Sequence, residues 1–391
     1  MRANKTKNDV WLVGAVTTLL TIGLVLVFSA SAVVAQEKFG SLIYYSGRQI
    51  AWGFFCLIII FVFSRVRYTS YQKKNFPLTG LIVTIVLLFG LFIFGDVVNG
   101  ARRWYNFGIA SFQPSEVAKI MLIIYFADIF SRKGDLLHDW KKGLLPHISL
   151  FALTVVPILI QPDLGTVVMI TMIISVMALL SNVRAKHVLA GVALIIPALI
   201  IKIQSSGYQS SRISDWYNNF FNPLGSGHQI KQSLIGLGTG GLFGSGIGSS
   251  KQKFYFLPDS HTDFAFSILG EEGGFLMTTV VLLLFLVILW RGIRIAKRAP
   301  STFAQYLAIG MTVNLVLYGF INVAVVTMLV PATGLPMPFL SYGGSSLIGI
   351  AFAVGILMNI SRNIQNPNMD TRLEQFREDK TKFYNTLVGS R

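Results

Sequence analysis

Residues 264–290, FAFSILGEEGGFLMTTVVLLLFLVILW, are the stretch of this chain that decides its fold. The run is apolar apart from two adjacent glutamates, and it exceeds the about 20 residues that a helix needs to cross a bilayer. Nine further apolar runs of sufficient length lie at 11–34, 47–64, 77–95, 114–131, 145–161, 163–181, 187–203, 304–329 and 344–361. The sequence therefore predicts an all-α, polytopic integral membrane protein with about ten transmembrane helices, in a single domain over residues 1–391.

The charged residues agree with a membrane protein and argue against a nucleic-acid-binding one. Charged residues make up 13% of the chain, whereas a soluble domain has about 25%. The net charge of +16 is unevenly placed: if both termini lie on one side, 23 Lys and Arg residues lie on that side and 9 in the opposite loops. Cytoplasmic loops carry such an excess. We therefore expect cytoplasmic termini, some attraction to anionic membrane lipid, and no nucleic acid as a partner.

Two features leave other topologies open. Three basic residues ahead of the first apolar run resemble the start of a signal peptide. The run from Trp11 to Val27 is long for the core of such a peptide, so we favour an uncleaved first helix. The boundary at 161–163 is also short. Merging the runs on either side of it would reverse all later helices and place the basic segment 291–303 outside, so we keep them separate.

The longest segment outside the spans is 204–263, which is expected to form a large extracytoplasmic loop between the seventh and eighth helices. Loops of this length in compact proteins are usually functional or disordered. Within the loop, 236–241 matches the dinucleotide pattern G-x-G-x-x-G, but no strand–helix–strand unit surrounds it. We interpret it as a close-packed glycine loop. Residues 362–391 are expected to form a solvated cytoplasmic tail.

Asp263, at the end of the stretch LPDSHTDF (257–264), is the first candidate for chemistry. A long apolar span begins directly after it, so its carboxylate would lie at the membrane boundary, where ionisable groups are costly and often functional. An Asp at this position could equally cap the helix by accepting backbone N–H bonds. A capping carboxylate at a wet surface can still take a proton. His261 is the alternative base.

A second cluster surrounds the start of the span at 114–131. Glu116 and Lys119 are three residues apart, so they share one helix face about one turn into the bilayer. A charged pair at that depth must face a partner or a water-filled cavity, and a purely structural ion pair is the alternative. Arg102 and Arg103 lie outside, beside the interfacial Trp104, and two such arginines suit an anionic ligand such as phosphate.

Two further segments carry polar groups on the same predicted side. Asp163 lies at the outer end of the span 163–181 and could neutralise Lys119 or bind a cation. The segment 331–346, PATGLPMPFLSYGGSS, holds no charge but has three prolines and several hydroxyls, including Ser341 and Ser345. Irregular backbone at membrane depth is tolerated where it is buried in protein or lines a cavity. We therefore predict one extracytoplasmic cavity lined by all four segments.

At these residues the chain resembles the SEDS family of peptidoglycan polymerases, which includes FtsW and RodA. The motifs that carry the resemblance occur in the family's order: NGARRW (99–104), FQPSEVAK (112–119), QPDLGT (161–166), QSLIGLGTGGLFGSG (232–246), LPDSHTDF (257–264) with GEEGG (270–274), and LPMPFLSYGGSS (335–346). They cover nearly the whole membrane region. The stretches before HTDF and around SYGGSS look more like FtsW, or its sporulation relative, than like RodA. Asp259 is a variation, because many relatives have Glu there.

The resemblance implies a glycosyltransferase of the bacterial cytoplasmic membrane that polymerises lipid II during cell division, with its active site on the extracytoplasmic side. It also implies a class B penicillin-binding transpeptidase as a partner, among other division proteins. By residue, it implies that Asp263 is the essential carboxylate. It further implies that Glu116, Lys119 and Asp163 form the polar lining of a central cavity.

The proposed step suits these residue types. A sugar hydroxyl is a poor nucleophile, so Asp263 would act as general base, while the pyrophosphate that leaves needs charge neutralisation. Arg102, Arg103 and Lys119, or a divalent cation such as Mg²⁺ or Mn²⁺ held with Asp163, could supply that charge. No organic cofactor is expected. Direct displacement would invert the anomeric centre. A lipid II flippase and a non-catalytic division scaffold are the alternative functions.

Overall fold

The computed structural model describes residues 9–73, 75–98, 101–108, 111–221, 228–254, 256–258 and 260–364. A helix lies at each of the ten predicted spans. These helices are α1 (Val10–Phe39), α2 (Tyr44–Phe63), α3 (Phe76–Phe94), α4 (Pro114–Lys133), α5 (Leu145–Ile160), α6 (Leu164–Leu179), α7 (Ala185–Ser205), α10 (Ala265–Lys297), α11 (Thr302–Val326) and α12 (Gly344–Ile364). Seven of the described helices are long and apolar enough to cross a membrane, and α5 and α6 are apolar but shorter. The chain is therefore a multi-pass, predominantly helical membrane protein.

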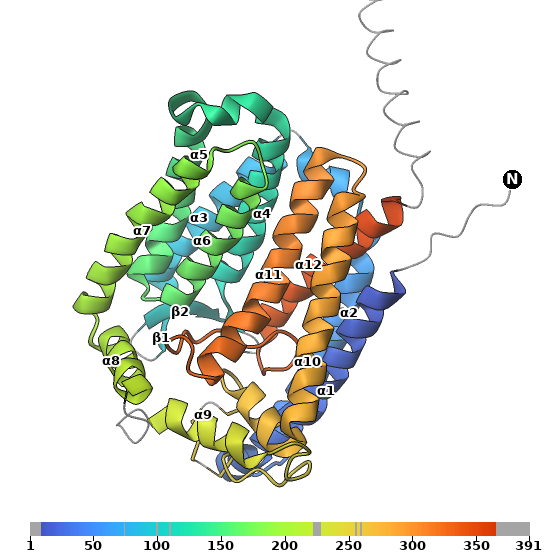
Figure 1. Cartoon of the computed structure of the whole chain (residues 1–391), viewed down its shortest axis with the longest axis vertical. Helices are drawn as coiled ribbons and strands as arrows, with labels where there is room; N and C mark the ends of the chain where they lie inside the picture. Colours follow the sequence, from blue (N-terminus) through green and yellow to red (C-terminus); the bar gives the residue numbers. More distant parts are fainter. Residues whose placement is uncertain are drawn as a thin grey trace, which may run out of the picture.

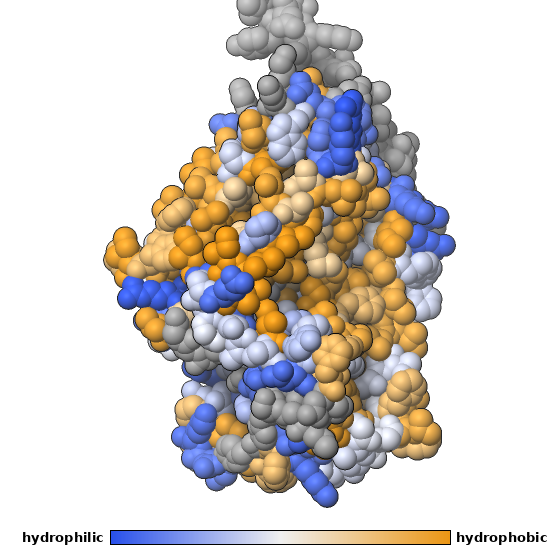
Figure 2. Space-filling model, turned by 60° about the vertical axis from the view of Figure 1, so that its left-hand side comes forward, coloured by the Kyte–Doolittle hydropathy of each residue, from blue (hydrophilic) through white to orange (hydrophobic). Residues whose placement is uncertain are grey.

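The helices form a bundle around α11 (Figure 1). α11 packs against α10, α12, α4 and α6, and α11 and α12 are the most buried of the seven helices that are long and apolar enough to cross a membrane. α7 lies at the rim and has no buried residue. On the face drawn in Figure 2, hydrophobic side chains dominate the middle and hydrophilic ones gather toward the two ends. Exposed apolar side chains such as Phe54, Ile93 and Leu194 suit a surface that faces lipid.

α1 begins and α12 ends at the same end of the bundle (Figure 1). There Asp9, just ahead of α1, accepts two hydrogen bonds from Arg291 in α10, and the Ser361 hydroxyl of α12 lies 3.4 Å from the same carboxylate oxygen. The start of α1 and the end of α12 therefore lie together, as the prediction of both termini on one side requires. The cytoplasmic placement of that end stays a prediction. The tail 365–391 lies outside the described residues.

The opposite end, here called the loop end, carries two further helices and a small sheet. The predicted large loop contains α8 (Gly207–Phe221) and α9 (His228–Thr239). Between α3 and α4 three short strands pair antiparallel in the order β1 (Asp96–Val98), β2 (Ala101–Asn106) and β3 (Ser111–Phe112). The sheet is an addition to the predicted all-helical architecture. Its signal was the Asn-Gly pair at 99–100, a strong hairpin sequence.

Short helical turns lie near the other end: η1 (Tyr68–Gln72), η2 (Gly134–His138) and the π-helical η3 (Trp140–Leu144). They join α2 to α3 and α4 to α5.

The span at 264–290 is not one continuous helix, because α10 breaks at Gly274, where φ is +67°. The glycine loop after α9 fills the break. The amides of Phe275 and Leu276 donate to the carbonyls of Gly241 and Leu242, and the loop amides of residues 245 and 246 donate to the carbonyls of residues 271 and 272. A Cβ at position 274 would lie 2.3 Å from the Gly244 nitrogen. The loop 240–246 thus supplies the partners that a broken helix lacks. The first part of the predicted glycine loop, residues 236–239, instead forms the last turn of α9.

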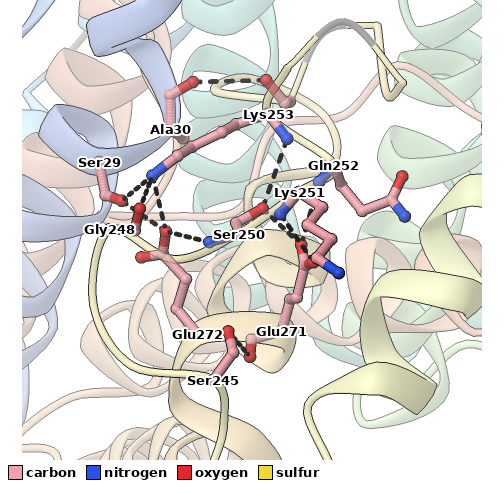
Figure 3. A network of polar contacts seen from close by, with 11 residues as sticks. Ser29, Ala30, Ser245, Gly248, Ser250, Lys251, Gln252, Lys253, Glu271 and Glu272 are labelled. Carbon is pink, nitrogen blue, oxygen red and sulfur yellow. Dashed lines mark hydrogen bonds and ion pairs between the residues drawn. The ribbon is translucent and has the colours of Figure 1, made fainter.

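A buried polar network holds the next part of the loop against α10 (Figure 3). Glu271 accepts hydrogen bonds from the Ser250 hydroxyl and from the amides of residues 251 and 252. Glu272 accepts from the Ser29 hydroxyl at 2.6 Å, from the Ser250 amide, and from Lys253 at 3.3 Å. Both glutamates and Lys253 are buried. The structure gives these two glutamates the role of anchoring the loop 245–253.

We predict that Gly274→Ala destabilises the protein. A side chain at positive φ is strained, at a cost of about 1–3 kcal/mol, and the added Cβ would clash with the main chain of the glycine loop. Gly14→Ala in α1 is the control, because a Cβ there meets nothing within 4 Å. The measurement is the melting temperature in detergent. Equal melting temperatures for the two variants would contradict the expected strain.

We also predict that Lys253→Met costs about 3–5 kcal/mol, because it leaves a buried carboxylate without its cation. Arg132→Gln is the matched control. Its ion pair with Asp128 has a short 2.6 Å contact between a 49% exposed arginine and a 10% exposed aspartate. Water at the arginine screens this pair, so we expect a smaller loss than for Lys253→Met. Denaturant or thermal unfolding in detergent compares the two. A similar loss in both would show that the loop network contributes no more than this partly exposed ion pair.

Candidate active site

Asp263 lies at the loop end, between the large loop and α10. The N-cap of α10 is Phe264, so Asp263 does not hold the capping position that was its alternative role. Its side chain is half-buried. Its main-chain carbonyl accepts a 2.7 Å hydrogen bond from the Asn322 side chain in α11, and the same amide group donates to the carbonyl of Leu335 at 2.9 Å. Asn322 is buried. One side chain of the central helix therefore fixes both Asp263 and the segment 331–343.

His261 is fixed through its main chain and packs its ring among aromatic residues. Its carbonyl accepts the Tyr342 amide at 2.9 Å. The ring centroid of His261 lies 4.8 Å from that of Tyr45 and 5.9 Å from that of Tyr342. Burial raises the pKa of the Tyr342 hydroxyl above its usual range, so this neighbour of His261 stays neutral.

Glu116 and Lys119 form a buried pair that a third residue completes. Lys119 Nζ lies 2.8 Å from Glu116 Oε1, and the Tyr318 hydroxyl in α11 donates to the same oxygen at 2.5 Å. Lys119 also donates to the Tyr318 hydroxyl. A cavity of about 180 Å³ lies beside the pair, and Glu116 and Ser345 are among the residues that line it. The lysine charge is thus balanced inside the bundle, next to a cavity, as the spacing required.

The two arginines predicted to bind phosphate are both engaged with main-chain carbonyls. Arg103 donates to the carbonyls of Gln161 and Pro162, at 3.0 and 2.5 Å, so it holds the turn between α5 and α6. Arg102 is exposed and donates to a carbonyl near the end of α3 at 2.5 Å. Trp104 is half-buried in β2. These contacts give the arginines a part in the architecture of the site.

Asp163 is the N-cap of α6. One carboxylate oxygen accepts the Thr166 amide and the other accepts the Gln113 side-chain amide, each at 3.3 Å. Within the described ranges no group of three or more His, Cys, Asp and Glu side chains could hold a metal ion. Divalent cations such as Mg²⁺ need several oxygen ligands. Mg²⁺ is often held by one or two carboxylates together with substrate phosphates, so a cation held with Asp163 stays a prediction, and we derive no step through it.

Ser341 and Ser345 stabilise the irregular segment and its junction with α12. The Ser341 hydroxyl accepts the Met337 amide at 2.8 Å, and its carbonyl accepts the side chain of Gln49. The Ser345 hydroxyl donates to the carbonyl of Ser111 in β3 at 2.5 Å. Both serines therefore make contacts within the protein at the loop end.

The structure places all the predicted segments at one end, because α4, α6, α10 and α12 all begin there (Figure 1). Asp263 and His261 lie with the segment 331–343, and Glu116 and Ser345 line one cavity. Asp163 and Arg103 share the turn before α6.

Sequence reasoning missed Tyr318, Asn322 and the arginine of α8, Arg212. Tyr318 and Asn322 had a usable signal, because they lie four residues apart on one face of an apolar span, where polar side chains are costly. Arg212 donates to the Ala332 carbonyl at 3.2 Å and so belongs to this end of the molecule. Its signal was weaker, since it is one cation in a long loop.

Comparisons with known proteins agree with this arrangement. The family model of the FtsW/RodA/SpoVE proteins, described as "Cell cycle protein", matches residues 10–366. Stage V sporulation protein E of Bacillus subtilis is 40% identical over 365 residues, which is 93% of this chain and 99% of that protein. A probable peptidoglycan glycosyltransferase FtsW of Geobacter sulfurreducens is 37% identical over 349 residues, which is 89% of this chain and 93% of the relative.

Two solved structures share the fold. A chain from a peptidoglycan synthase complex, studied for the coordination of polymerization and crosslinking, superposes with a TM-score of 0.73 at 24% identity, over 92% of this chain and 99% of that one. The rod shape determining protein RodA of Thermus thermophilus superposes with a TM-score of 0.65 at 24% identity, over 92% and 98%. With a family model that matches nearly the whole chain and relatives at 37–40% identity, this chain belongs to the FtsW/RodA/SpoVE family.

Proposed function

We propose that this chain is a peptidoglycan glycosyltransferase that polymerises lipid II into glycan strands during cell division, with Asp263 as general base. The observation that carries the proposal is the half-buried Asp263, whose main-chain carbonyl is held at the loop end of a family fold by Asn322 of the central helix. Relatives at 35–37% identity are named probable peptidoglycan glycosyltransferases. Their names and the position of Asp263 support the same chemistry.

In the proposed step, Asp263 accepts the proton of a sugar hydroxyl on one lipid-linked disaccharide. The hydroxyl oxygen bonds to the anomeric carbon of a second lipid-linked sugar, while the bond from that carbon to the pyrophosphate oxygen breaks. The lipid pyrophosphate leaves as an anion, and the anomeric configuration inverts. A positioned base accelerates such a step by about 10²–10⁴-fold. The stable leaving anion explains why no second carboxylic acid is needed beside Asp263, as it is in glycosidases.

We place this chemistry on the extracytoplasmic face. The excess of 23 basic residues over 9 supports a cytoplasmic location for the chain ends, and the loop end lies opposite them (Figure 1). As a partner we propose a class B penicillin-binding transpeptidase. The similar chain from a complex that couples polymerization to crosslinking supports an assembly of this kind.

We predict that Asp263→Asn lowers lipid II polymerisation by at least about 10²-fold, because an amide cannot accept the proton. The measurement is glycan strand formation in proteoliposomes that carry lipid II on the face of the loop end, with the transpeptidase included. Glu37→Gln is the control, since it removes an exposed carboxylate from the same end of the bundle.

Each alternative function predicts a different result in this assay. A flippase would make no glycan with either protein. A scaffold would support division equally well with Asp263→Asn. Normal polymerisation by Asp263→Asn would refute the assignment of the base.

We further predict that the product linkage is inverted relative to the donor sugar, because direct displacement by the hydroxyl attacks the face opposite the pyrophosphate. Analysis of the anomeric configuration of strands made in the same proteoliposomes measures this. Retention would require a covalent glycosyl intermediate and would rule out the single displacement.

A further inference from the structure

α8 is fastened to the loop end by one polar face. Gln209, Arg212 and Trp216 lie three and four residues apart, so they share one side of the helix. Each donates to a main-chain carbonyl: Gln209 to Pro162 at 2.8 Å, Arg212 to the segment 331–343 at 3.2 Å, and Trp216 to Met328 at 2.9 Å. α8 therefore bridges the turn before α6 and the segment after α11, and Arg212 lies between the two anchors.

Arg212 and Asp263 border the same open position. Gly334 has φ of +73°, and a Cβ built on it would lie 3.5 Å from Arg212 Nη1 and 3.6 Å from Asp263 Oδ2. Gly334 is exposed, while the arginine and the aspartate are half-buried. A guanidinium and a carboxylate thus flank a spot where the chain carries no side chain. A reaction that needs a base and an anion-binding group close together requires such a spot.

We propose that Arg212 binds the pyrophosphate group of the lipid-linked donor and neutralises it as it leaves. This inference rests on the proposed function. The leaving oxygen gains negative charge in the same step in which Asp263 takes the proton, so a cation is needed near the base. Arg212 reaches that position from α8. Lys119 lies against Glu116 inside the bundle and Arg103 lies at the turn before α6, and neither borders Gly334 as Arg212 does.

The residue type suits this ligand. A guanidinium is always charged and carries five N–H donors in a planar fork, which matches the oxygens of a phosphate group. Its bond to the Ala332 carbonyl sets the direction of the side chain. The absence of a side chain at Gly334 leaves the approach between Arg212 and Asp263 open.

The test measures binding in a background without turnover. In full-length protein carrying Asp263→Asn, the affinities for undecaprenyl pyrophosphate and for undecaprenol are measured by native mass spectrometry. Adding Arg212→Gln is expected to weaken binding of the pyrophosphate lipid by about tenfold or more, the loss typical of a charge-assisted hydrogen bond. Binding of undecaprenol should not change. Arg212→Lys keeps the charge but loses the planar fork of donors. Its affinity for undecaprenyl pyrophosphate should lie between that of the parent and that of Arg212→Gln.

Two control variants separate charge from structure. Lys251→Gln removes one positive charge from the same large loop at an exposed side chain, and it should leave both affinities unchanged. Trp216→Phe removes one anchor of α8 without changing charge, and it should weaken pyrophosphate binding by less than about threefold.

The proposal would be overturned if Arg212→Gln bound undecaprenyl pyrophosphate as tightly as the parent. It would also be overturned if Arg212→Gln or Trp216→Phe weakened both lipids equally, since that would show a structural role for α8. The proposed function is judged separately, by the turnover of the unsubstituted chain against Asp263→Asn. A failure of the Arg212 proposal in the binding test can therefore be told apart from a failure of the proposed function in the turnover test.

Discussion

Backbone N–H and C=O groups at membrane depth must find partners within the protein, because lipid offers none. The break in α10 meets this requirement through the glycine loop after α9, whose main chain pairs with both sides of Gly274. The adjoining loop 250–252 is held by the buried Glu271 and Glu272. The loop that leads to Asp263 is therefore tied to the helix that follows it, and the candidate base occupies a defined position.

Buried charged side chains, like buried main-chain groups, have partners within the protein. The lysine ammonium groups in the core each lie against a carboxylate: Lys119 against Glu116, with Tyr318 completing the set, and Lys253 against Glu272. A charge left alone in such surroundings would cost several kcal/mol. The two sets differ in their neighbourhood. The Glu116 and Lys119 pair adjoins a cavity, whereas the Glu272 and Lys253 pair belongs to the network that anchors a loop. Buried ion pairs of the same kind thus line the candidate site in one place and stabilise the fold in the other.

The candidate active site is assembled by the central helix. Asn322 of α11 joins the Asp263 carbonyl to the segment after α11, and Tyr318, one turn away, joins the Glu116 and Lys119 pair. Arg212 of α8 and Asp263 both border Gly334. Base, cation and cavity thus come from four separate parts of the chain that share one scaffold helix.

The sequence by itself determined the ten apolar helices, the placement of both ends together, and the motifs whose polar residues lie at the loop end, because span length and charge bias are local properties that lipid enforces. It missed the strands between α3 and α4 and the break in α10, although Asn99, Gly100 and Gly274 carried signals for them. Only the tertiary structure decided the partners: that Arg103 binds carbonyls, that Glu271 and Glu272 hold a loop, and that Arg212 lies beside Asp263. Those pairings join residues tens to hundreds of positions apart, and the packing of one helix against another selects among them.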